Sequence, residues 1–310
     1  MVGATASGAV LARWLVAPAT GEVRREQAVA AAFLRVVLGL MWLYNVAWKR
    51  PPGFESLEHF IAFAVSHPVL PPFSLVVEKV VLPNIAIFGW GVLIVESALA
   101  VMLLTGAWVR VAAALGAIQS LAIGLSVALA PDEWPWAYIL MIAAHVAVLF
   151  SSAGRVFAVD AVRSGVGPAP RLARQWGAIA VVTGVAGALG SAGDPLARSG
   201  FGLGSSALEV GLGEYNLLGG LVLVLAGGLL LASARGGNVL LGRAAAAVGA
   251  VAALSLYAQV GFTGPFLGGT ATSAAFLVCI ALVAAMTGGA PSRPVPDRAA
   301  ETPETPSPPG

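Results

Sequence analysis

Cysteine and charged residues are scarce in this chain. Of its 310 residues only Cys279 is a cysteine, so the chain by itself can form neither an internal disulfide nor a dithiol redox pair. Charged residues make up 10% of the sequence, whereas soluble globular proteins carry about 25%. So few polar side chains cannot cover a surface that faces water, which argues against a soluble enzyme.

Motifs for several common functions are also missing. The sequence has no zinc-ligand spacing, no glycine-rich phosphate loop between a strand and a helix, and no basic stripe suited to nucleic acid. We therefore expect no metal site and no nucleic-acid partner.

Apolar residues are what the chain has in abundance. They make up 58% of the sequence, the mean hydropathy is +0.87, and several apolar runs reach the ~20 residues needed to cross a bilayer. Because each run is apolar around its whole circumference, we expect an all-α, polytopic membrane protein. Eight spans are expected, at residues 27–48, 84–106, 108–130, 134–153, 175–192, 214–233, 239–262 and 270–287. The many glycines should let spans pack closely, with Gly184 and Ala188 at one such contact.

The distribution of Lys and Arg predicts the orientation in the membrane. Cytoplasmic segments of membrane proteins are enriched in these residues. With the N-terminus inside, four of the 17 fall in outer segments, Arg35 lies within the first span, and the others fall in inner segments. We expect a multi-pass protein of the plasma (inner) membrane with both termini cytoplasmic. The inner residues are Arg13, Arg24, Arg25, Arg110, Arg155, Arg163, Arg171, Arg174, Arg235, Arg243, Arg293 and Arg298.

The chain divides into five segments on this basis. The N-terminal segment should hold a short interfacial helix, with Trp14 at the level of the lipid headgroups. The first outer loop should hold a short amphipathic helix around Phe60, Ile61 and Ala64, which the prolines at residues 68, 71 and 72 end. The segments are 1–26, a four-helix domain at 27–163 with an outer loop at 49–83, a linker at 164–174, a second four-helix region at 175–287, and a disordered tail at 288–310.

Three ionisable residues lie inside the expected spans. A rise of ~1.5 Å per residue places Arg35 and His145 roughly 12 Å, and Glu96 roughly 15 Å, from the cytoplasmic ends of their spans. Gln119, in the third span, lies at a similar depth. Because an unpaired charge in lipid is costly, we expect Arg35 and Glu96 to form an ion pair with His145 and Gln119 nearby.

Two interpretations of this cluster stay open. The pair either locks helix packing alone or forms a ligand or proton site, and His145 by itself fits a packing hydrogen bond as well as catalysis. In the functional interpretation the catalytic residues are Arg35, Glu96 and His145. The candidate substrate-binding residues are Gln119, Asn45 and Lys49, although snorkelling to the interface also explains the last two.

Three motifs in the first half point to a family. The first span reads LRVVLGLMWLYNVAWKRPP, the second contains VESALAVMLLTGAWVR, and the fourth ends in AGRVFAVDAVR. Their order and spacing over residues 29–163 resemble the DoxX/DoxD family. The residues that carry the resemblance are Arg35, Leu38, Gly39, Lys49, Glu96, Gly106, Arg110, Gly154, Arg155 and Asp160.

The resemblance implies a four-helix membrane bundle and a redox function. DoxD-like proteins are membrane subunits of thiosulfate:quinone oxidoreductases, so the resemblance implies quinone as cofactor and a smaller redox partner subunit. The four spans within 175–287 have no counterpart in this resemblance.

Three functions are compared on these grounds. The first is an integral membrane subunit of a quinone-linked oxidoreductase, with quinone entering laterally from the lipid. The second is a non-catalytic membrane scaffold or partner subunit of a redox complex, and the third is a small-solute transporter. In each case membrane lipid is a partner, and an oligomer is compatible with the sequence.

Overall fold

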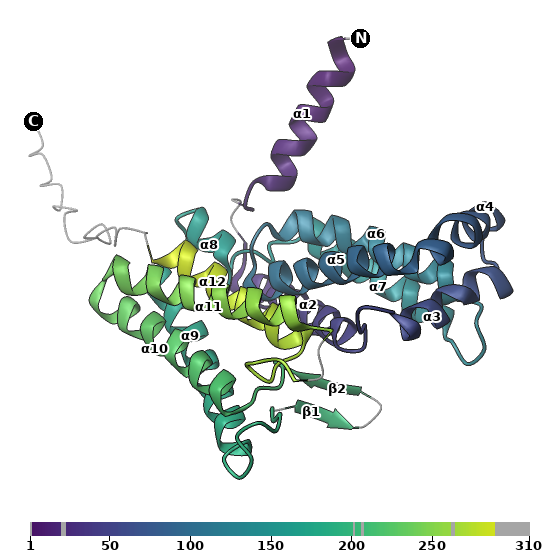
Figure 1. The fold of residues 1–310 in the computed structure, drawn as a ribbon. Helices are drawn as coiled ribbons and strands as arrows, with labels where there is room; N and C mark the ends of the chain where they lie inside the picture. Colours follow the sequence, from purple (N-terminus) through teal and green to yellow (C-terminus); the bar gives the residue numbers. More distant parts are fainter. Residues whose placement is uncertain (1, 20–22, 201, 206–207, 262–263, 289–310) are drawn as a thin grey trace, which may run out of the picture.

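The computed structural model describes residues 2–19, 23–200, 202–205, 208–261 and 264–288, and these are mainly helical (Figure 1). The tail expected to be disordered lies outside the described residues, apart from Gly288. The α-helices of the described part are α1 (Val2–Val16), α2 (Arg25–Ala47), α3 (Glu55–Ser66), α4 (Pro71–Val76), α5 (Ile85–Thr105), α6 (Val109–Val127), α7 (Pro135–Phe150), α8 (Val159–Arg163), α9 (Ala169–Gly190), α10 (Leu217–Gly236), α11 (Val239–Gln259) and α12 (Ala271–Thr287).

Six helical stretches in the described part are long and apolar enough to cross a membrane by length and composition. These are α2, α6, α9, α10, α11 and a stretch from Pro71 to Thr105 that ends with α5. The helices α7 and α12 are also apolar, with 16 and 17 residues. The expected helical fold with several membrane-spanning helices is therefore confirmed.

The structure corrects the expected boundaries in two places. Residues 71–83, expected in the outer loop, form α4, a π-helical turn η1 (Val77–Val81) and most of a 3-10 turn η2 (Leu82–Asn84), and these lead into α5. Helix α9 begins at Ala169, inside the expected linker. Prolines lie in the first turns of α4 and α9, where a missing N–H breaks no helical hydrogen bond, so they begin these helices.

A short β-hairpin lies between α9 and α10 and was not expected from the sequence. Strand β1 (Gly202–Ser205) pairs with β2 (Leu208–Gly211) in an antiparallel register, with Gly202 opposite Gly211. The segment is rich in glycine and serine, which have weak strand preference, so the pattern did not indicate strands.

Glycines bring α9 and α10 into close contact. A Cβ atom on Gly184 would lie 2.6 Å from the carbonyl oxygen of Gly220, and one on Gly220 would lie 2.7 Å from the backbone nitrogen of Ala188. The expected close contact at Gly184 and Ala188 is confirmed, with α10 as the partner helix.

Helix α12 joins the two halves of the chain. It packs against α5 and α2 of the first half and against α9 and α11 of the second (Figure 1). Phe276, Cys279 and Ile280 of α12 are fully buried. Phe276 contacts Trp176 of α9, whose ring stacks on Phe157 from the turn after α7 at a centroid distance of 5.6 Å. The core is therefore continuous from α2 to α12.

Candidate functional site

Glu96 of α5 lies at the centre of a buried polar cluster. Its Oε2 atom lies 2.5 Å from Nζ of Lys49, and the two side chains are only 1% and 2% exposed. Gln119 of α6 donates from Nε2 to Oε1 of Glu96 at 3.4 Å. Lys49 also donates to the carbonyl oxygen of Asn45 at 2.9 Å. We call Lys49, Glu96 and Gln119 the polar cluster.

The antiparallel packing of α2 and α5 brings the ion pair together. Gly39 of α2 lies against Leu104 of α5, and a Cβ on this glycine would be 2.9 Å from the backbone nitrogen of Leu104. Lys49 follows Gly39 by ten residues, roughly 15 Å along a helix, and Glu96 precedes Leu104 by eight, roughly 12 Å. The two side chains therefore meet at the same level.

Lys49 is buried within the protein and is not exposed at its surface, contrary to the snorkelling interpretation. Its residue is 3% exposed, and its ammonium lies 3.9 Å from the centroid of the Trp48 ring. Asn45 contributes its carbonyl oxygen to Lys49, while its side chain donates to Met41 of its own helix at 3.2 Å.

The expected ion pair between Arg35 and Glu96 is not formed in the described part of the chain. Arg35 is fully buried and donates from Nη2 to the carbonyl oxygens of Phe157 at 2.8 Å and Val156 at 3.4 Å. Side chains on a helix point toward its N-terminus, so Arg35 extends toward the start of α2 and packs over Gly106 at the end of α5. The depth estimate from backbone positions missed this direction.

Asp160 organises the end of the bundle where Arg35 lies. Its carboxylate accepts hydrogen bonds from the backbone N–H groups of Trp108 at 3.0 Å and Val109 at 2.9 Å, at the start of α6. Arg163 donates to the same carboxylate at 2.7 Å. A carboxylate is stabilised at a helix N-terminus, so Asp160 caps α6 from a distant part of the sequence. We call this end of the molecule the Asp160 end.

His145 of α7 forms helix-packing hydrogen bonds. Trp42 of α2 can only donate, so its Nε1–H group donates to Nε2 of His145 at 2.9 Å. The other ring nitrogen, Nδ1, is then protonated and donates to the carbonyl oxygen of Met141 at 2.8 Å. The imidazole ring packs against Gly116 of α6, where a Cβ would collide with it. With both nitrogens bonded, His145 joins α2, α6 and α7.

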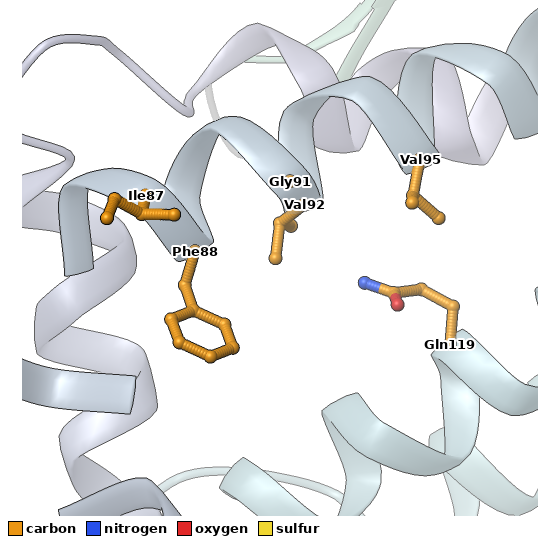
Figure 2. Close-up of a pocket in the computed structure, with 6 residues that line it drawn as sticks. All are labelled: Ile87, Phe88, Gly91, Val92, Val95 and Gln119. Carbon is orange, nitrogen blue, oxygen red and sulfur yellow. The ribbon is translucent and has the colours of Figure 1, made fainter. Parts of the chain in front are cut away.

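An apolar groove adjoins the polar cluster on the outside of α5. It has a volume of about 240 Å³ and is lined by one face of α5 and by Gln119 of α6. Figure 2 shows the Gln119 side chain extending toward Val92 and Val95, with its amide nitrogen directed into the groove. Ile87 is 73% exposed and Val95 39%, so the lining is continuous with the outer, apolar surface of α5. The lining residues are Ile87, Phe88, Gly91, Val92, Val95 and Gln119.

The arrangement combines an apolar entrance with a polar inner end. Gln119 lies both in the groove and in contact with Glu96, so it connects the groove to the buried ion pair. The groove can hold a flat apolar molecule, and the amide can donate a hydrogen bond to a carbonyl oxygen. Within the described ranges, no group of three His, Cys, Asp or Glu side chains is arranged to hold a metal ion.

Sequence reasoning named every member of the polar cluster but did not predict its pairing. Glu96 and Gln119 were expected to be neighbours and are. The partner of Glu96 is Lys49, and the partners of Arg35 are carbonyl oxygens before Asp160. The spacing of these residues in and just after α2 and α5 indicated the correct pairing. Arg35 precedes Lys49 by 14 residues, and Glu96 precedes Gly106 by ten. In an antiparallel pair of helices that places Lys49 near Glu96 and Arg35 near Gly106.

Comparison of the chain with models of known protein families, with curated proteins and with solved structures gives no match.

Proposed function

We propose that the chain is an integral membrane subunit of an oxidoreductase, and that it binds a quinone from the lipid phase in the groove beside Gln119. The observation that carries this proposal is the contact between an exposed apolar groove and the buried Glu96–Lys49 ion pair through one amide side chain. The motifs that resemble the DoxX/DoxD family support the same function, and thiosulfate:quinone chemistry is one form of it.

The residues of the groove fit a quinone head group. The groove is apolar apart from the amide of Gln119, which can donate to a quinone carbonyl. Gly91 leaves space in the groove, because it is exposed and a Cβ there would have no neighbouring atom within 4 Å. A bound quinone supplies two-electron, two-proton redox chemistry.

The polar cluster holds charge and protons near the groove. Glu96 and Lys49 are both shielded from water, so a proton moved between them alters the electrostatic environment at Gln119 strongly. Arg35 and His145 have other roles in this proposal, because Arg35 binds the turn before α8 and His145 is bonded to Trp42 of α2. The electrons come from a redox partner subunit, which fits a chain whose single cysteine is buried.

The proposed topology is eight spans with both termini in the cytoplasm of a plasma (inner) membrane. Each of the eight expected ranges overlaps one apolar helix, namely α2, α5, α6, α7, α9, α10, α11 or α12. The excess of arginine in the segments on the side of the N-terminus supports this orientation. The Asp160 end would then be cytoplasmic.

The test measures quinone binding to the purified chain in lipid nanodiscs. A short-chain ubiquinone or menaquinone is added, and the quenching of tryptophan fluorescence reports binding. Gly91→Leu fills the groove from its lipid side and should weaken binding by at least tenfold. Gly228→Leu is the matched control, because Gly228 of α10 also has open space around it. Gln119→Leu should cost about tenfold through the lost hydrogen bond.

Equal binding to the wild type and to Gly91→Leu would refute the proposed groove. No saturable binding of either quinone to the wild type would refute the quinone function altogether. The scaffold function would then be favoured if a partner protein still co-purified with the chain.

A further inference from the structure

Helix α1 stands away from the rest of the described chain (Figure 1). Its base is held by two arginines of the Asp160 end. Arg110 donates to the carbonyl oxygens of Trp14 at 3.0 Å and Ala17 at 3.3 Å, and its guanidinium carbon lies 4.5 Å from the centroid of the Trp14 ring. Arg155 donates to the carbonyl oxygen of Ala19 at 3.0 Å. These hydrogen bonds anchor α1 at its C-terminal end.

One face of α1 is apolar and continues the exposed apolar surface of α7. Val10, Leu11, Trp14 and Leu15 follow the spacing of one helix face. Val10 is 67% exposed and Leu11 56%. Trp14 contacts Phe150 at the end of α7 at a ring distance of 5.6 Å, and Phe150 is itself 72% exposed. Whatever covers Phe150 therefore also reaches the face of α1.

The surroundings of α1 carry a positive charge. Residues 2–26, 106–110 and 151–163 hold six arginines against Glu22, Glu26 and Asp160. Asp160 is neutralised by Arg163, and Glu26 pairs with Arg24 at 3.6 Å. Arg13 and Arg25 are exposed, so positive charge flanks the apolar face.

We infer that α1, with the arginines around its base, binds the surface of an anionic phospholipid bilayer. At 15 residues the helix is roughly 22 Å long, too short to cross the ~30 Å of hydrocarbon. An apolar face next to a tryptophan and flanked by arginines is typical of helices that lie in the headgroup region. Anionic headgroups complement the positive charge, and the acyl chains that cover Phe150 also cover Val10 and Leu11.

The test measures the depth of α1 in the full-length protein. A nitroxide is attached at Leu11→Cys on a Cys279→Ala background, and the protein is placed in nanodiscs of phosphatidylcholine alone or with 30% phosphatidylglycerol. Collisions with oxygen report burial in lipid, and collisions with a water-soluble nickel chelate report exposure. The label should be embedded in the anionic discs and should move toward water in 0.5 M NaCl.

Charge variants identify the residues responsible. Each arginine near an anionic surface should favour the embedded state by about fivefold. Replacing Arg13, Arg24 and Arg25 with Gln should therefore lower the ratio of embedded to water-exposed label by more than tenfold. Arg50→Gln with Lys79→Gln, distant in sequence from this region, is the control and should leave the ratio unchanged. Equal depth in both lipids, or spin–spin broadening that shows a second copy on α1, would overturn the inference. The test does not depend on quinone binding.

Discussion

The ion pair of Lys49 and Glu96 is the least expected arrangement at the scale of single residues. Two charges removed from water cost several kcal/mol each, which their attraction offsets only when the geometry is good. At 2.5 Å, with Gln119 and the Asn45 carbonyl as further partners, each ion has hydrogen-bonding neighbours. The pair is therefore stable only as a pair.

Removal of one charge should be worse than removal of both. Lys49→Met leaves Glu96 as an unpaired buried carboxylate and should destabilise the protein by about 3–5 kcal/mol. The double variant Lys49→Met with Glu96→Met should recover most of this loss. Reversible unfolding in mixed detergent with SDS measures both. The exposed neighbour Arg50, changed to Met, should alter stability by less than about 0.5 kcal/mol. A double variant that is as unstable as Lys49→Met alone, or less stable, would contradict this account.

At the scale of elements, close backbone contact explains how α9 and α10 pack. The contact runs along both helices, from Gly184 with Gly220 to Gly177 with Gly227, where a Cβ on Gly227 would lie 2.8 Å from the Gly177 carbonyl oxygen. In lipid the hydrophobic effect does not drive helices together, so packing at small residues must do so. The atoms that would collide belong to the backbone and cannot move aside.

Gly184→Val should therefore separate the two helices. The added side chain meets the Gly220 carbonyl oxygen at 2.6 Å and the Val224 nitrogen at 2.8 Å, and the cost should be about 1–3 kcal/mol. Gly228 lies on α10, the helix that packs against α9, but a side chain there would face open space. Gly228→Val should therefore lower the free energy of unfolding by less than about 1 kcal/mol. Unfolding in SDS followed by circular dichroism distinguishes them. Equal losses would show that helix propensity, and not the contact, is responsible.

At the scale of the whole molecule, the two halves are joined by α12 and by aromatic contacts at the Asp160 end. Arg35 binds the carbonyl oxygen of Phe157, and the Phe157 ring stacks on Trp176 of the second half at an interplanar angle of 6°. Trp176 then contacts Phe276 of α12. A residue first considered catalytic thus holds the turn that connects the halves.

The stack should be detectable as a coupling between the halves. Phe157→Leu and Trp176→Leu should each destabilise the protein, and the double variant should show a coupling energy of about 0.5–1.5 kcal/mol. Trp136→Leu, at an exposed tryptophan, provides the control partner for Phe157→Leu and should show no coupling. The coupling energy comes from a double-mutant cycle, in which the free energy of unfolding in SDS is measured for the wild type and every variant. Full additivity at Phe157 and Trp176 would mean that the stack does not connect the halves energetically.

The sequence by itself determined the membrane class, the approximate positions of the apolar helices and the burial of Arg35, Glu96 and His145. Long apolar runs can satisfy their backbone hydrogen bonds in lipid only as helices or closed barrels, so composition restricts the architecture before any contact is known. The close approach at Gly184 was predictable for the same local reason, since small residues mark tight helix contacts.

Tertiary structure alone decided which charges pair and where the groove lies. Pairing depends on helix register and on the direction in which a long side chain extends, so Glu96 meets Lys49 while Arg35 reaches carbonyl oxygens near Asp160. The prolines at residues 71 and 72 begin α4 instead of ending the previous element, because the backbone that follows them turns into helix. The groove forms between α5 and α6, and a surface shared by two helices has no signature in either helix alone.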